Sequence, residues 1–166
     1  QKEREILQDV KKKSDYIIDT TNLKLGRLKE EVTRIFVEGK ISHNLTVSFV
    51  SFGYKYGIPS DSDLVFDVRF LPNPYYVESL KLLTGNNKEV QDYVMQSDIS
   101  NEFLNRLINL LEFLLPNYIQ EGKSNLIISI GCTGGKHRSV TIANKLADYF
   151  GNENYRVTIS HRDEYK

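Results

Sequence analysis

Hydrophobic positions follow two different periods along this chain, and the alternation between them predicts the elements of the fold. Short runs rich in β-branched and aromatic residues are typical of strands, and they occupy 45–52, 64–68, 126–130 and 156–160. Apolar residues three and four positions apart are typical of helices, and they occupy 25–37, 100–115 and 139–150. The middle helix is expected to end before Pro116, because proline lacks a backbone donor and restricts the residue before it.

The last part of the chain arranges these elements as strand, glycine-rich loop, helix and strand. The run over 126–130 is almost entirely apolar, as in a strand that is buried within a parallel sheet. A helix between two such strands forms a βαβ crossover, which makes the strands parallel. We therefore expect an α/β fold with a mainly parallel sheet, flanking helices and a βαβ unit around the loop.

The N-terminal part of the chain is polar and charged. A helix is predicted over 3–13, a short strand over 15–19 and a turn over 20–22. The first residue is Gln1 rather than Met, so we expect the chain to be a piece of a longer protein.

Composition and charge exclude several classes of protein. The 22 Lys and Arg residues balance 22 Asp and Glu residues, which argues against a uniformly basic nucleic-acid binder. The single cysteine, Cys132, excludes an internal disulfide, and the three histidines show no metal-ligand spacing, so no metal site is expected. No apolar run approaches the roughly 20 residues of a membrane-spanning helix, and no signal peptide is visible. A reducing, cytoplasmic location fits these features.

The clearest candidate site is the segment GCTGGKHRS over 131–139, which leaves a predicted strand and enters a predicted helix. Its glycines allow backbone N–H groups to approach a ligand, and the helix N-terminus adds further donors and the positive end of a dipole. Its cations add charge, and no acid occurs over 131–145. The segment therefore predicts a bound phosphate or similar dianion; the alternative is a tight turn that only packs. The predicted ligand-binding residues are Cys132, Thr133, Gly134, Gly135, Lys136, His137, Arg138 and Ser139.

Two other phosphate-binding patterns match this loop in part. A nucleotide P-loop has Ser or Thr after its Gly-Lys pair, but His137 occupies that position, so nucleotide binding by this loop is not expected. Cys132 and Arg138 have the C-x5-R spacing of cysteine phosphatases, in which a thiolate attacks phosphorus while the loop holds the oxygens. Gly131 stands where those enzymes place a histidine, and Asp67 is a candidate general acid. A cysteine-dependent phosphatase is therefore the alternative function.

Further polar residues follow the other predicted strands, whose carboxyl ends meet at one edge of a parallel sheet. The residues that could support a ligand there are Lys55, Asp67, Arg69, His161 and Arg162. Asp67 could recognise a hydroxyl or ammonium group and Arg69 an anion, but the two could equally form a salt bridge. Lys55 could equally pack its own loop, and the last two residues could simply be exposed.

The loop resembles the signature of the RapZ/YvcJ family, in its C-terminal domain. Four further segments agree with that family in order and spacing: DYIIDTTNL over 15–23, SFGYKYGIP over 51–59, FDVRFLPNP over 66–74 and SHRD over 160–163. The resemblance covers almost the whole chain, and its long motifs are highly specific.

The resemblance implies a two-domain protein. Residues 1–40 would be the tail end of an N-terminal P-loop nucleotide-binding module plus a linker helix, and residues 41–166 a C-terminal domain similar to part of phosphofructokinase. Binding and hydrolysis of ATP or GTP would belong to the N-terminal module. We therefore expect no enzyme activity and no cofactor in this chain.

The resemblance also implies a role. In the family, the C-terminal domain binds small regulatory RNAs, senses glucosamine-6-phosphate and serves as an adaptor for an endoribonuclease. We therefore expect a regulatory domain that binds an amino-sugar phosphate at the loop. Small RNA, a ribonuclease and further copies of the chain are its expected partners, and a membrane is not.

Overall fold

The structure is a computed structural model that describes residue 20 and residues 24–36, 45–152 and 155–166. The predicted helix over 3–13, the strand over 15–19 and most of the turn over 20–22 lie outside these residues. The chain divides into two compact units, residues 1–42 and residues 43–166. In the first unit the described element is helix α2, Leu25–Phe36, which confirms the helix predicted over 25–37.

The second unit is built on a sheet of four parallel strands in the order β2–β3–β1–β4. The strands are β1 (Thr46–Gly53), β2 (Leu64–Asp67), β3 (Asn125–Cys132) and β4 (Arg156–His161). Single 3-10 turns follow two of them: η1 (Tyr54–Tyr56) after β1 and η2 (Pro74–Tyr76) after β2. The expected α/β fold with a parallel sheet is confirmed.

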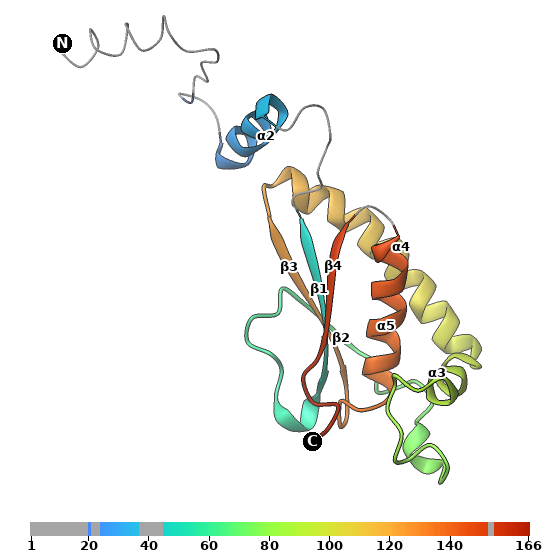
Figure 1. Cartoon of the computed structure of the whole chain (residues 1–166). Coiled ribbons are helices and arrows are strands. Elements are labelled where there is room, and N and C mark those ends of the chain that lie inside the picture. Colours follow the sequence, from blue (N-terminus) through green and yellow to red (C-terminus); the bar gives the residue numbers. More distant parts are fainter. Residues whose placement is uncertain (1–19, 21–23, 37–44, 153–154) are drawn as a thin grey trace, which may run out of the picture. The chain divides into compact units, whose positions relative to one another are not determined.

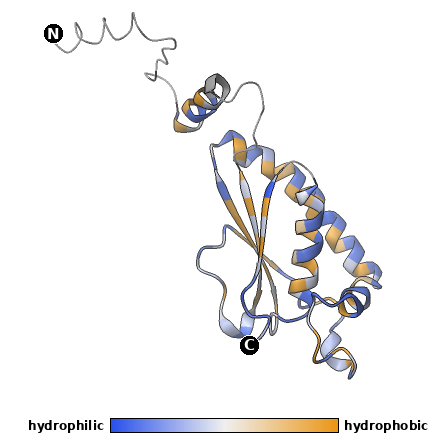
Figure 2. Ribbon diagram, viewed as in Figure 1, coloured by the Kyte–Doolittle hydropathy of each residue, from blue (hydrophilic) through white to orange (hydrophobic). Residues whose placement is uncertain are grey.

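Three helices accompany the sheet: α3 (Lys88–Met95), α4 (Asp98–Gln120) and α5 (Arg138–Gly151). The two long helices, α4 and α5, lie on the same face of the sheet (Figure 1). Their hydrophobic and hydrophilic residues alternate in bands, as expected of amphipathic helices (Figure 2). Helix α5 connects β3 to β4, so the βαβ unit predicted around the loop is present.

The core lies between these helices and the helix-facing side of the strands. Alternate residues of the strands, such as Phe49 and Ile128, are fully buried and lie in register with one another. They share one cluster with Leu111 of α4 and with Leu146 and Phe150 of α5. The ring centroids of Phe49 and Phe150 are 6.1 Å apart, which places an aromatic pair across the helix–sheet interface.

The prediction that the helix beginning near Ser100 ends before Pro116 is wrong, because α4 continues to Gln120. Pro116 has no N–H group for the carbonyl of Glu112, and the side chain of Asn117 donates to the neighbouring carbonyl of Phe113 at 2.6 Å. The apolar face also continues past the proline, since Ile119 packs against the core. Burial of this last turn therefore outweighs the local cost of proline.

Helix α3 was not predicted from the sequence. Its eight residues, KEVQDYVM, are half polar and too few to show a helical period clearly. Its buried residues are Val90 and Val94, four positions apart, and they place one face of α3 against the rest of the domain.

Candidate anion-binding site

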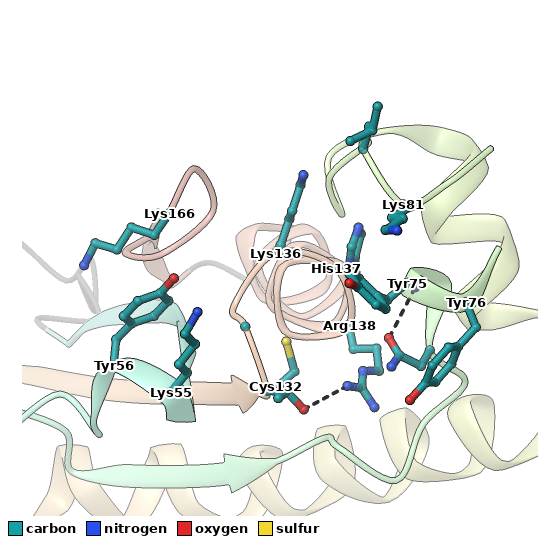
Figure 3. A pocket seen from close by; sticks show the side chains of 14 residues that line it. Lys55, Tyr56, Tyr75, Tyr76, Lys81, Cys132, Lys136, His137, Arg138 and Lys166 are labelled. Carbon is teal, nitrogen blue, oxygen red and sulfur yellow. Dashed lines mark hydrogen bonds between the residues drawn. The ribbon is translucent and has the colours of Figure 1, made fainter. Parts of the chain in front are cut away.

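The segment after β3 lies at the carboxyl end of the sheet and forms the floor of a cavity of about 530 Å³ (Figure 3). Segments that leave all four strands contribute to its lining. The lining residues are Lys55, Tyr56, Asn73, Tyr75, Tyr76, Lys81, Leu82, Cys132, Thr133, Gly134, Lys136, His137, Arg138 and Lys166. This is the crevice in which ligands of open parallel sheets bind.

Glycines bring the backbones around this cavity into direct contact. A Cβ atom on Gly53 would lie 2.6 Å from the carbonyl carbon of Gly134. Gly135 has φ of +81°, and a Cβ there would lie 2.7 Å from the nitrogen of Gly53. The contact between β1 and the loop therefore needs glycine at both positions. Gly53 permits the close approach, and Gly135 permits both the close approach and a left-handed backbone conformation.

Several backbone donors of the loop have no partner among the described residues. Thr133, Gly134 and Lys136 carry backbone N–H groups for which the described part of the chain offers no hydrogen-bond acceptor. Helix α5 begins at Arg138, directly after the loop, and adds the free N–H groups and positive dipole end of its first turn. Both features favour a bound anion.

The guanidinium of Arg138 fixes the segment that follows β2. One of its terminal nitrogens donates to the carbonyl of Arg69 and, at 3.3 Å, to that of Leu71. The other donates to the hydroxyl of Thr133 at 3.2 Å. The side chain is only 5% exposed, and its Nε–H has no partner among the described residues. Arg138 thus holds the segment after β2 against the loop, and its Nε–H remains available as a donor.

Cys132 is buried at the base of the loop. Its sulfur lies 3.1 Å from the hydroxyl oxygen of Ser139 and accepts a hydrogen bond from the amide of Gly135 at 3.2 Å. The sulfur is thus held between a hydroxyl group and a backbone amide. The geometry around the sulfur is therefore compatible with the phosphatase alternative.

His137 lies at the junction of the loop and α5, and it is 7% exposed. Burial lowers its pKa; the carbonyls of Leu83, Lys81 and Leu80 partly oppose this, while the positive charge of Lys136 adds to it. The ring is therefore neutral near pH 7, and its Nε2 has no hydrogen-bond partner within the described residues.

The charge of the cavity is entirely positive, since no Asp or Glu belongs to its lining. Lys166 pairs with Asp163 at 2.7 Å. Within the residues that the structure describes, no carboxylate lies in ion-pair distance of Lys55, Lys81 or Lys136. An unneutralised group of ammonium charges in one concave site attracts anions.

Asp163 lies outside the lining and holds together segments that border the cavity. Its carboxylate is fully buried and accepts hydrogen bonds from the amide of Gly53 at 2.8 Å, from Arg162 at 2.7 Å and from Lys166 at 2.7 Å. Burial alone would raise the pKa of Asp163, but these hydrogen bonds lower it to about 2. The carboxylate therefore stays ionised and holds the end of β1 beside the C-terminal segment.

The structure brings only some of the predicted site residues to the cavity. Six of the eight predicted loop residues line the cavity, whereas Gly135 and Ser139 do not. Among the predicted supporting residues, only Lys55 lines the cavity. Asp67 and Arg69 instead pair with each other at 2.6 Å, and this hydrogen bond lowers the pKa of Asp67.

The last two supporting residues, His161 and Arg162, also lie outside the lining. The Nδ1 of His161 lies 2.9 Å from the hydroxyl of Ser51, and burial lowers the pKa of this imidazole. Arg162 donates to Asp163 and to the carbonyl of Gly57 at 2.6 Å. Both side chains therefore fasten the C-terminal segment to β1 and the loop after it.

Sequence reasoning did not assign several lining residues to the site, among them Asn73, Lys81, Leu82 and Lys166. They lie well beyond the strand ends and reach the cavity because their segments fold back to it. The amide of Gly85, for example, donates to the carbonyl of Lys136 at 2.9 Å. Only one general rule could have pointed to these residues: segments that follow parallel strands meet at the carboxyl edge of the sheet.

Two absences hold for the described residues. They contain no group of three or more His, Cys, Asp or Glu side chains that could hold a metal ion. None of their helices is long and apolar enough to cross a membrane.

Comparison with known proteins identifies the family. Residues 45–165 match the family described as the RapZ C-terminal domain. A nucleotide-binding protein of Alkaliphilus oremlandii is 60% identical over 161 residues, which are 97% of this chain and 56% of the relative. Nucleotide-binding proteins of Clostridioides difficile and Caldanaerobacter subterraneus are 57% and 54% identical, with 97% of this chain and 56% and 57% of the relatives covered.

This chain spans about half the length of the curated relatives that it matches. The family match covers the whole sheet, its helices and the loop after β3. The chain therefore belongs to the RapZ family, and residues 45–165 are its RapZ C-terminal domain.

Proposed function

We propose that this domain is a regulatory module that binds a phosphorylated metabolite in the cavity at the carboxyl end of the sheet. One observation carries the proposal: the cavity joins a glycine-rich loop at a helix N-terminus with five cationic side chains and no carboxylate. Such a combination binds phosphate through amide donors, dipole and charge together.

An amino-sugar phosphate such as glucosamine-6-phosphate is the ligand that the family resemblance suggests. The cavity has the size of small-molecule sites, and its tyrosines offer apolar faces to a sugar ring. Asp67, expected to receive the ammonium group, lies outside the lining and is held by Arg69. The ammonium would therefore be received by a tyrosine face, through a cation–π contact.

Calorimetry with inorganic phosphate, glucose-6-phosphate, glucosamine-6-phosphate and unphosphorylated glucosamine tests the proposal. We expect binding of the three phosphorylated compounds and none of glucosamine. Lys136→Ala should weaken binding about tenfold, as the loss of a charge-assisted contact does. Lys88→Ala is the matched control, because Lys88 is exposed, pairs with Asp92 and lies outside the cavity. Binding that Lys136→Ala leaves unchanged contradicts the proposal.

A cysteine-dependent phosphatase is a second candidate, favoured by the contacts of the Cys132 sulfur with Ser139 and the amide of Gly135. The thiolate would attack phosphorus as the bond to the leaving-group oxygen breaks, and water would then hydrolyse the thiophosphate. However, no carboxylic acid lines the cavity to protonate the leaving group. Turnover of p-nitrophenyl phosphate that Cys132→Ser abolishes would establish this candidate, and a lack of turnover rejects it.

For the whole protein, we propose the architecture that the family implies. An N-terminal module would bind and hydrolyse ATP or GTP, and the domain described here would control a ribonuclease through small RNA in the cytoplasm. Self-association would occur through this domain. Light scattering of the 166-residue chain at micromolar concentration tests the last point, and a monomer mass contradicts it.

A further inference from the structure

The cavity has two separate sides, and the order of the strands creates them. Strand β3 lies between β2 and β1 in the sheet, so the loop that leaves β3 runs between the segments that leave its neighbours. The β2 side includes Tyr75, Tyr76 and Lys81, and the β1 side includes Lys55, Tyr56 and, from the segment after β4, Lys166. Figure 3 shows the two sides on opposite flanks of the loop, with Lys136 between them.

Both sides place an ammonium group against a tyrosine ring. On the β1 side, the Nζ of Lys55 lies 5.4 Å and the Nζ of Lys166 5.1 Å from the ring centroid of Tyr56. On the β2 side, the Nζ of Lys81 lies 5.0 Å from that of Tyr75, and the neighbouring Tyr76 is 84% exposed. An aromatic face beside a cation suits a sugar or nucleobase ring that carries a phosphate at its edge.

The centre of the cavity is polar and has no tyrosine ring. It consists of the loop, the start of α5 and the ammonium group of Lys136. Two residues of the lining that are more than nine-tenths buried, His137 and Arg138, have Nε2 and Nε atoms without a partner among the described residues. Unpaired buried polar atoms are costly, and an oxygen of a bound anion would satisfy the Nε–H donor of Arg138.

We propose that the ligand is a diphosphate that carries a ring-bearing group at each end, as in a nucleoside diphosphate sugar. This rests on the proposed function and narrows its ligand class. The diphosphate lies on the loop, one ring lies on Tyr56 and the other lies on Tyr75 and Tyr76. A sugar monophosphate fills the centre and one side only, which leaves the other lysine–tyrosine pair without a contact.

Calorimetry with inorganic phosphate, pyrophosphate, glucose-6-phosphate, UDP-glucose and ADP-ribose tests this inference. We expect UDP-glucose or ADP-ribose to bind at least about tenfold more tightly than the compounds with one ring or none. Tyr56→Leu and Tyr76→Leu should each weaken that binding about fivefold and leave pyrophosphate binding unchanged, because only rings contact the tyrosines. Tyr165→Leu is the control, since Tyr165 is exposed and lies outside the cavity.

The outcomes separate this inference from the proposed function. If glucose-6-phosphate binds as tightly as UDP-glucose and ADP-ribose, the inference is overturned and the proposed function stands. If no phosphate compound binds, both are rejected. If a short single-stranded RNA binds and neither diphosphate compound does, the two sides serve bases of RNA and the inference is wrong. Circular dichroism of each variant shows whether it retains the fold.

Discussion

Gly134 and Gly135 are neighbours in the loop, but their surroundings differ. A Cβ on Gly134 would meet open space, and this residue has an ordinary backbone conformation. A Cβ on Gly135 would lie 2.8 Å from the Cβ of Asp163, and its φ of +81° disfavours any side chain. One glycine therefore keeps the cavity open, and the other permits the fold of the loop.

The two alanine variants should therefore have opposite phenotypes. Gly134→Ala should change the free energy of unfolding by less than about 0.5 kcal/mol and weaken phosphate binding about fivefold, since its methyl group projects into the cavity. Gly135→Ala should lower the free energy of unfolding by about 2 kcal/mol or more, through strain and overlap. Urea denaturation and calorimetry measure the two effects. Equal loss of stability in both variants contradicts this interpretation.

Asp163 gives the domain a defined response to acid. Its pKa is about 2 when folded and 3.8 in its ordinary environment, so its ionised form stabilises the fold at pH values above 4. This contribution, about 2 kcal/mol, should disappear as the pH falls from about 4 to 2. Asp163→Asn should lower stability at pH 7 and remove this part of the pH dependence. Urea denaturation across this range is the measurement, and Asp92→Asn, on the exposed face of α3, is the control.

Helix α4 shows how an element can persist against a local signal. Pro116 is exposed and interrupts the backbone hydrogen bonds of α4, whereas residues on both sides of it pack on the core. Pro116 weakens the helix only locally, through one missing hydrogen bond and its ring. The packing of the apolar face stabilises the helix over most of its length.

Pro116→Ala should therefore stabilise the domain. Alanine restores the missing hydrogen bond and removes the proline ring, and these gains exceed the entropy that proline removes from the unfolded chain. We expect the free energy of unfolding to rise by about 1–2 kcal/mol. Thermal and urea unfolding measure it. A loss of stability would mean that the proline ring makes contacts that matter more than helix geometry.

The strands could be predicted from the sequence more reliably than the helix ends. The runs around Phe49 and Ile128 are apolar because they are buried in the sheet, so composition alone reports their environment. Helix α3 gives no such signal, since it buries only Val90 and Val94. The end of α4 depends on tertiary packing, which a local rule about proline does not contain.

At the scale of the whole molecule, the loop was predictable and the cavity was not. Glycines and cations within nine residues predict a phosphate-binding segment from the sequence alone, and six of its eight predicted residues line the cavity. Lys81, by contrast, lies about fifty residues before the loop and becomes a neighbour only because of the strand order and the fold of the segment after η2. Asp67 is the opposite case. It lies at the end of a strand, where a site residue is expected, but its carboxylate pairs with Arg69 and does not line the cavity.

The domain over 43–166 should fold without the preceding unit. Every residue of the described core cluster lies in this second unit, from Leu45 to Val157. A protein of residues 43–166 should unfold in one cooperative transition at the urea midpoint of the longer chain, because no buried apolar contact of this cluster is lost. Its phosphate affinity should also be unchanged. A molten state, with helical circular dichroism but no sharp transition, contradicts this expectation.

The glycine contacts around the loop have a consequence for how ligand choice can change. The segments after β1 and β3 meet through backbone at Gly53, Gly134 and Gly135, so the shape of the floor does not depend on the side chains at either flank. Residues such as Tyr56, Tyr76 and Lys81 are then free to be exchanged without unfolding the domain. For the ligand proposed above, contacts to phosphate and contacts to rings would therefore depend on different residues, and substitutions at the flanks would change the second set without altering the loop.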